Sequence, residues 1–327
     1  MKHVTQRQLR AFEAVARNRS FSRAAEEMHL TQPAVSTLIK QLEAHAGLAL
    51  FEQLGKKIYL TTAGTEMLRH ARAIIAQLRE AEDAMAQLKG ISGGTLNIAV
   101  ISAGDYFFPR LLAEFQRRNA GVTLNLAVFN RAELLHQLAS NLTDLAVMVR
   151  PPEELDTINE SFAPHPYVVV ASPDHALAGR RRIPISILAQ EPFVMRERGS
   201  DTWNSMREAF GTQFGKLRIA MEIQSTETIK QAVIAGLGIA FLSAHTISME
   251  RRLGQLVVLD VVGFPARFDW FVVHRRNKRL PAVAQAFKSF LLSDGAGLIE
   301  HLMRAPDAAG ATRGLARPRP RRPMTDA

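Results

Sequence analysis

Arginine and hydroxyl side chains recur at the ends of short apolar runs in the middle of this 327-residue chain. Each run is typical of a β-strand and precedes residues that are typical of a helix start. Hydroxyls and backbone N–H groups at helix N-termini, with arginine forks beside them, bind anions. We expect these side chains to converge on one site for a small anion, although a surface ion pair is the alternative for each arginine alone. The candidates are Ser102, Arg131, Arg150, Arg196, Ser200, Thr202 and Thr226.

Three carboxylates stand close to these candidates in the sequence, namely Glu197, Asp201 and Glu227. Carboxylates beside arginines neutralise part of the positive charge, and they also bind the hydroxyl groups of sugars. We therefore expect an anion site in which these carboxylates balance part of the positive charge of the arginines.

A second group of polar side chains lies near the N-terminus. Thr31 can cap a helix that has Pro33 in its first turn, where a missing N–H costs nothing. Apolar residues at helical spacing, Val35 and Leu42 among them, mark the inner face. The other face can offer hydrogen bonds to base edges and a charge to phosphate. Its residues are Gln32, Ser36, Thr37 and Lys40.

Two earlier helices are predicted to position this one, over residues 5–17 and Ser22–Met28. Ala24 and Ala25 allow two helix axes to approach closely, so the pattern indicates a helix-turn-helix that places its second helix in the major groove of DNA. The alternative is an ordinary three-helix core with a solvated polar face. A hairpin, Leu48–Phe51 with Ile58–Leu60, follows and carries Lys56 and Lys57 at its basic tip.

One long helix is predicted from Thr61 or Thr62 to about Leu88, because no proline interrupts it and Gly90 follows. Its apolar side chains follow a heptad repeat that continues over about three heptads. The seam comprises Met67, Ala71, Ile74, Leu78, Ala81, Met85 and Leu88. This seam favours pairing of two copies of the chain; packing on its own domain is the alternative.

Beyond Thr95 the sequence alternates between strands and helices. A βαβαβ order predicts a parallel sheet with helices on both faces, and a second such set follows before the chain returns through Phe268–His274. A closing helix is expected over Leu280–Leu292. The first three strands are Leu96–Ile101, Val122–Phe129 and Asp144–Val149.

The net charge of +10 lies mostly at the two ends of the chain, with +4 in residues 1–62 and +4 in residues 304–327. The second of these segments is rich in proline and arginine and is expected to be a disordered tail or a phosphate-contacting arm.

The chain has no cysteine, no apolar run long enough for a membrane and no signal peptide, which together favour the cytoplasm.

The N-terminal motifs resemble the DNA-binding domain of LysR-type transcriptional regulators. They cover essentially residues 5–66, and the resemblance implies that Gln32, Pro33, Ser36 and Lys40 face double-stranded DNA. In place of the arginine that often follows the Leu-Phe-Glu of the wing, this chain has Gln53. The matching segments are Phe21–Ser36, Ile39–Glu43, Leu50–Glu52 and Leu60–Gly64.

The middle of the chain is similar to the periplasmic-binding-protein-like effector domain of the same family. This likeness implies lobe I over roughly 91–163 and 268–303 and lobe II over 164–267, with a ligand in the cleft between them. We expect a winged helix-turn-helix over 1–62, a linker and dimerisation helix over 63–90 and the effector domain over 91–303.

Three segments resemble the branch of the family that controls RuBisCO and other Calvin-cycle genes. The resemblance implies an activator that binds a partly palindromic site as a dimer or tetramer and responds to a phosphorylated metabolite. The alternative is a regulator of another metabolic operon with a carboxylate effector. Arg198 and Asp201 stand where that branch is expected to have proline and glycine. The segments are Asp144–Asp156, Val169–His175 and Glu227–Ile239.

Two rival functions fit the sequence less well. Gly236-Leu237-Gly238 is part of a dinucleotide fingerprint, but it follows a helix and lacks the third glycine. The sequence contains no P-loop, no nucleophile elbow and no histidines at metal-ligand spacing. We therefore expect that the protein is not an enzyme and binds neither a cofactor nor a metal. A transporter's solute-binding protein would share the two lobes, yet it would leave residues 1–89 unexplained.

Overall fold

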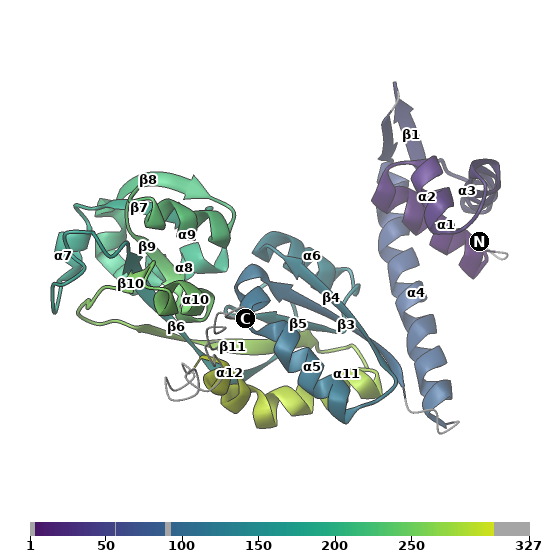
Figure 1. The fold of residues 1–327 in the computed structure, drawn as a ribbon. Coiled ribbons are helices and arrows are strands. Elements are labelled where there is room, and N and C mark those ends of the chain that lie inside the picture. Colours follow the sequence, from purple (N-terminus) through teal and green to yellow (C-terminus); the bar gives the residue numbers. More distant parts are fainter. Residues whose placement is uncertain (1–3, 56, 89–92, 304–327) are drawn as a thin grey trace, which may run out of the picture.

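The computed structural model describes residues 4–55, 57–88 and 93–303. The N-terminal unit packs three helices around a small apolar core (Figure 1). Each helix begins at a side-chain cap, which satisfies N–H groups that the helix leaves free. The caps are Thr5, Ser20 and Thr31, and the helices are α1 (Gln6–Asn18), α2 (Phe21–Glu27) and α3 (Gln32–Ala46). Ala24 and Ala25 are buried where α2 packs, as the helix-turn-helix pattern predicted.

The predicted hairpin is present as the antiparallel strands β1 (Phe51–Leu54) and β2 (Lys57–Leu60). Glu43 at the end of α3 accepts hydrogen bonds from the backbone N–H groups of Leu50 and Phe51, over 2.8 and 3.3 Å. This contact fixes the hairpin against the helix that precedes it. Lys56, one of the two predicted basic residues of the tip, lies outside the described residues.

The long helix α4 (Thr62–Leu88) is capped by Thr61, whose hydroxyl accepts from the N–H of Gly64 over 2.9 Å. A Cβ on Gly64 would meet the carbonyl oxygen of Leu50 at 2.0 Å, so only glycine fits where the helix passes the hairpin. Within the described part of the chain, no helix is long and apolar enough to cross a membrane.

Lobe I contains the predicted parallel strands, with β3 between β4 and β5 in the sheet. Its strands and helices lie next to α4 in Figure 1. The elements are β3 (Gly94–Ile101), η1 (Ser102–Tyr106), α5 (Phe108–Arg118), β4 (Val122–Phe129), α6 (Arg131–Ala139), β5 (Leu145–Met148), α11 (Ala282–Phe290), η4 (Leu291–Gly295) and α12 (Ala296–Met303).

Two long strands, β6 (Thr157–Ala171) and β11 (Ala266–Arg275), run antiparallel from lobe I into lobe II. Their register shifts between Trp270 and Phe271. The lobe boundaries expected from the sequence fall inside these two strands. Only the last third of β6, from Tyr167 onward, is recognisable as a strand in the sequence, because Pro164 and Pro166 precede it.

Lobe II is built on the far ends of β6 and β11, where β9 and β10 pair with β6. A separate parallel pair, β7 and β8, lies beside it. The elements are α7 (Ile185–Leu188), β7 (Pro192–Arg196), α8 (Asp201–Phe210), η2 (Gly211–Lys216), β8 (Arg218–Ile223), α9 (Thr226–Ile234), β9 (Ala240–Ser243), η3 (Ala244–Thr246), α10 (Ser248–Arg252) and β10 (Val257–Val258).

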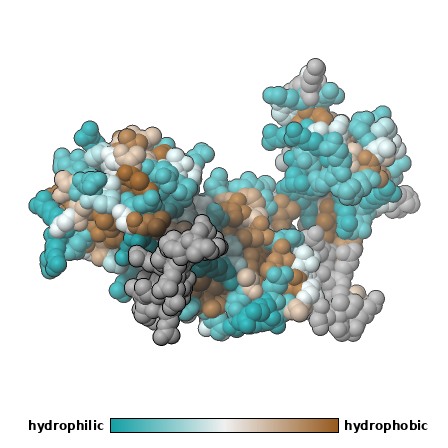
Figure 2. Space-filling model, viewed as in Figure 1, coloured by the Kyte–Doolittle hydropathy of each residue, from teal (hydrophilic) through white to brown (hydrophobic). Residues whose placement is uncertain are grey.

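One apolar core continues from lobe I through the crossing strands into lobe II. Tyr167 and Trp270, which lie on these strands, are part of it. Figure 2 shows hydrophilic residues over most of the visible face of the N-terminal unit, whereas hydrophobic residues gather on the visible faces of both lobes.

Gly236 and Gly238 have positive φ, and a Cβ on Gly238 would meet the carbonyl oxygen of Pro192 at 2.2 Å. Gly238 therefore allows close packing against Pro192, whereas Gly236 allows the left-handed turn that follows α9.

Candidate functional site

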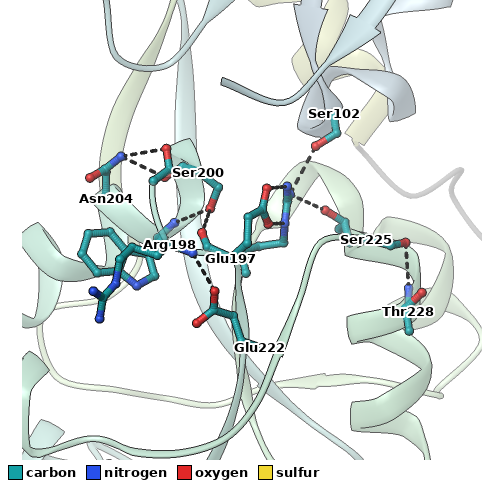
Figure 3. A network of polar contacts seen from close by, with 12 residues as sticks. Ser102, Glu197, Arg198, Ser200, Asn204, Glu222, Ser225 and Thr228 are labelled. Atoms are coloured by element: carbon teal, nitrogen blue, oxygen red, sulfur yellow. Dashed lines mark hydrogen bonds and ion pairs between the residues drawn. The ribbon is translucent and has the colours of Figure 1, made fainter. Parts of the chain in front are cut away.

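Arg196 is the centre of a polar cluster that joins the two lobes. Figure 3 shows the network of polar contacts around it, with Ser102 and Glu197 among the labelled residues. It ends strand β7 and is only 5% exposed. Its Nη1 donates to Ser102 Oγ of lobe I over 3.2 Å and to Thr226 Oγ1 of lobe II over 3.1 Å. Both hydroxyls lie at the start of a helical segment, so the structure brings three of the predicted residues into contact.

The remaining face of the Arg196 guanidinium is taken by its sequence neighbour Glu197. Nε and Nη2 donate to the two carboxylate oxygens of Glu197 over 2.7 and 2.9 Å. This pairing is bidentate and charge-assisted, the strong geometry for an arginine and a carboxylate. The predicted residue Ser200 caps α8 by accepting from the N–H of Trp203 and donates to the carbonyl of Glu197.

Arg131 and Asp201 form a second contact between the lobes. Arg131 begins α6 in lobe I, and its Nη1 donates to Asp201 Oδ1 at the start of α8 over 2.6 Å. Burial raises the pKa of Asp201 above its ordinary value, while Arg131 acts in the opposite direction. Arg131, a predicted anion ligand, is thus already paired with a carboxylate.

A third charged group also lies where lobe I contacts lobe II. The Lys230 ammonium is buried, 2.6 Å from Glu250 and 2.7 Å from Glu227. It also lies 4.7 Å from the ring centre of Tyr106, whose hydroxyl donates to Glu227 from lobe I. Burial lowers the pKa of Lys230, but its hydrogen bonds to the two glutamates outweigh this and raise the pKa above its ordinary value.

Arg150 lies apart from the cluster around Arg196. Its Nη1 donates to Glu208 over 2.6 Å, and its guanidinium faces the ring of Phe268. This pair also links the two lobes, because Arg150 follows β5 of lobe I and Glu208 lies near the end of α8 in lobe II. Thr202, by contrast, is buried at the start of α8.

Tyr167 and Ser205 were not singled out in the sequence, although both are buried beside Thr202. The hydroxyl of Tyr167 lies close to the side chains of Thr202 and Ser205. Burial raises the pKa of Tyr167, although these two side chains act to lower it, so the phenol is protonated and available as a donor. Their signal in the sequence was weak, because a lone Tyr in an apolar strand is typical of core packing.

The predicted polar face of α3 is exposed. Gln32, Pro33, Thr37 and Lys40 point to solvent, and Ser36 is half-buried, while Val35, Ile39 and Leu42 form the core behind them. The Thr37 hydroxyl donates to the carbonyl of Pro33 over 2.9 Å, which leaves its oxygen free to accept. Lys57 is exposed on β2.

Comparisons with known proteins agree with both parts of this arrangement. Residues 6–65 match the bacterial regulatory helix-turn-helix proteins of the lysR family, and residues 89–296 match the LysR substrate binding domain. The chain belongs to the LysR family of transcriptional regulators. This membership confirms the predicted family and excludes the enzyme and the transporter-associated protein as rivals.

The LysR regulators that it resembles include the RuBisCO operon transcriptional regulator of Allochromatium vinosum, with 50% identity over 90% of this chain and 97% of that protein. The regulatory domain of CcmR from Synechocystis PCC6803, solved in complex with 2-PG, is 38% identical and superposes with a TM-score of 0.59 over 62% of this chain and 96% of that chain. Full-length CbnR, solved with its target DNA, shares the fold with a TM-score of 0.66 at 21% identity, over 88% of this chain and 98% of that chain.

The heptad seam of this LysR chain divides into two parts. Met67 packs against the core of the N-terminal unit, and Ala71 is fully buried in that core, so Ala71 is not part of an exposed seam. Ile74, Leu78 and Met85 are 48%, 38% and 55% exposed. Ala81 is exposed as well, whereas the side chain of Leu88 lies outside the described residues.

Two buried histidines lie where the strands of this LysR regulator cross between lobes. The rings of His165 and Trp270 are tilted by 53° with their centres 4.3 Å apart, and Trp270 Nε1 donates to His245 Nδ1 over 3.3 Å. Burial lowers the pKa of His245 to about 4 and the pKa of His165 well below its ordinary value. His245 also lines a cavity of about 570 Å³ between α10 and α12. Among the described residues, no group of three His, Asp or Glu side chains is arranged to hold a metal ion.

Proposed function

We propose that this LysR regulator controls genes of CO₂ fixation, including those for RuBisCO, and activates them in response to a small phosphorylated metabolite. The observation that carries the effector part is the Arg196 guanidinium held between Ser102 and Thr226, one from each lobe. A guanidinium flanked by two hydroxyls and a helix N-terminus suits a phosphate oxygen.

The identity to regulators of RuBisCO operons supports the target genes, and the likeness to a CcmR domain bound to 2-PG supports the class of effector. A ligand that contacts both lobes stabilises one relative arrangement of them, and it shifts the protein toward that arrangement by its differential affinity. The exposed face of α3 would read DNA in the cytoplasm, and the exposed part of the α4 seam would pair two copies on two half-sites.

The proposal is tested by measuring binding to the promoter DNA of a RuBisCO operon by fluorescence anisotropy, with and without 2-PG. We expect 2-PG to change the DNA affinity or footprint of the natural protein, and Arg196→Gln to remove that change. Arg207→Gln is the matched control, because the exposed Arg207 faces the ring of Trp203 and is not part of the cluster around Arg196. An effect of 2-PG that survives Arg196→Gln would move the effector site elsewhere, and a response to non-phosphorylated carboxylates alone would change the effector class.

A further inference from the structure

The buried cations at the contact between the two lobes already have carboxylate partners within the described chain. Arg131 pairs with Asp201, Lys230 with Glu227 and Glu250, and Arg196 with Glu197. A ligand phosphate that is to bind one of these cations directly therefore has to take the place of a carboxylate. The three groups differ in how easily the carboxylate can leave.

Two of these groups are structural. The carboxylate of Asp201 is 3% exposed and accepts a further hydrogen bond from the backbone N–H of Val149, so its removal would leave buried groups unpaired. Lys230 is held from two sides, and the side chain of Glu250 is only 11% exposed. Displacing either carboxylate would cost the desolvation energy of a buried charge.

Glu197 differs from both. Its side chain is 19% exposed, and Arg196 is the one hydrogen-bond partner of its carboxylate within the described structure. The backbone of the same residue is anchored separately, because its carbonyl accepts from both the N–H and the hydroxyl of Ser200. The carboxylate can therefore swing away from Arg196 by side-chain rotation while the loop stays in place.

We propose that the Glu197 carboxylate is an internal competitor of the effector, which occupies the anion position on Arg196 until a ligand phosphate replaces it. This inference rests on the proposed effector site at Arg196. The carboxylate is planar and the phosphate is tetrahedral, but each can accept two parallel hydrogen bonds from the Arg196 guanidinium. Ser102 and Thr226, which hold Nη1, keep Arg196 in place during the exchange.

The exchange sets the metabolite concentration at which the regulator responds. A ligand that binds only molecules whose Arg196 is free has an apparent affinity reduced by the fraction of such molecules. If Glu197 covers Arg196 in about nine molecules of ten, its removal tightens apparent ligand binding roughly tenfold.

The test uses the full-length protein and isothermal titration with 2-PG. Glu197→Gln removes the charge at nearly constant size, and we expect it to lower the Kd for 2-PG roughly tenfold. Glu222→Gln is the matched control, since Glu222 accepts from the N–H of Arg198 in the same loop but does not contact Arg196. Glu197→Asp, which keeps the charge on a shorter side chain, is expected to give an intermediate Kd.

A second readout separates competition from simple positioning of Arg196. Without ligand, Glu197→Gln leaves the buried Arg196 uncompensated and should lower the Tm, and 2-PG should then raise the Tm more than in the natural protein. An unchanged or weaker affinity in Glu197→Gln would show that Glu197 orients Arg196 and would overturn the proposal. If the natural protein binds 2-PG and Arg196→Gln abolishes this, that result leaves the effector site standing; absence of 2-PG binding in all variants would overturn both.

Discussion

Arg131 and Asp201 are 70 positions apart in sequence, yet the Arg131 guanidinium lies 2.6 Å from the Asp201 carboxylate and joins lobe I to lobe II. Their side chains are 17% and 3% exposed, so little water screens the pair. We expect Asp201→Asn to lower the free energy of unfolding by about 3–5 kcal/mol, because it leaves a mostly buried cation without its counter-ion.

Urea unfolding followed by tryptophan fluorescence measures this loss, since both tryptophans of the chain, Trp203 and Trp270, lie in the two-lobed unit. Asp294→Asn is the control: Asp294 forms an ion pair with Arg118 whose side chains are 37% and 48% exposed, and such pairs contribute about 1 kcal/mol or less. Equal losses in the two variants would contradict the structural role of the Arg131–Asp201 pair.

The polar face of α3 predicts how the protein distinguishes its operator. Replacing Gln32 or Ser36 with alanine should weaken specific DNA binding by roughly 1–3 kcal/mol if a base contact is lost, with little effect on random DNA. The ratio of specific to random affinity, measured at one salt concentration, reports this directly. A ratio that stays the same would remove these two residues from base recognition.

The basic tip of the hairpin predicts a salt effect. Replacing Lys56 and Lys57 together with glutamine should reduce the slope of log affinity against log salt by about one or two, because two phosphate contacts release fewer counter-ions. Lys216→Gln, in η2 of lobe II, is the control for loss of an exposed cation elsewhere. The hairpin would not be a phosphate contact if both proteins gave the same slope as the natural chain.

The exposed part of the α4 seam predicts that Leu78→Asp disrupts pairing of the chains. A charge placed in an apolar seam is buried on association, so we expect a lower oligomeric mass by light scattering at micromolar concentration. Gln77→Asp introduces the same charge one position away from the seam and should leave the mass unchanged. Retention of the full mass in Leu78→Asp would place the interface on another surface.

The histidines at the lobe crossing predict a loss of stability in acid. His245 has a folded pKa of about 4, below its unfolded value, so between these two values the unfolded chain binds more protons. Stability is therefore full above about pH 6.5 and falls as the pH drops toward 4, by about 3 kcal/mol for this group. The buried His165 acts in the same direction.

Urea unfolding at pH 7.5 and pH 5 measures the difference. His245→Gln should reduce it, whereas His70→Gln should not, because the side chain of His70 is 55% exposed on α4. An identical pH dependence in the natural protein and in His245→Gln would rule out His245 as a cause.

The helices and strands whose patterns are local were predictable. Val122–Phe129 and Arg218–Ile223 agree residue for residue, and Thr31 caps α3 as expected, because alternation, periodicity and caps depend on neighbouring residues. The part of β6 before Tyr167 was not predictable, since its pairing with β11 depends on residues about a hundred positions away and outweighs the two prolines.

The candidate site was predictable in its residue types but not in their pairing. The order of strands and helices placed Ser102, Arg196 and Thr226 at one cleft, and the structure brings them into contact. The partners of Arg131 and Arg150 depend on the approach of two lobes, which no local pattern encodes.

Ala71 of the predicted heptad seam lies instead in the core of the N-terminal unit, because the first turns of α4 pack on α1.

The ladder between β6 and β11 makes lobe II an insertion into lobe I. Ala163 and Trp270 are paired neighbours in this ladder, so the segment between them leaves and re-enters lobe I at adjacent points. A short turn at that place would close β6 and β11 as a hairpin on a complete lobe I sheet. Arg196 and Thr226 lie on the inserted segment, whereas Ser102 stays behind. Lobe II is therefore one contiguous insertion that carries two of the three residues joined at Arg196, while lobe I carries the third and the connection to α4.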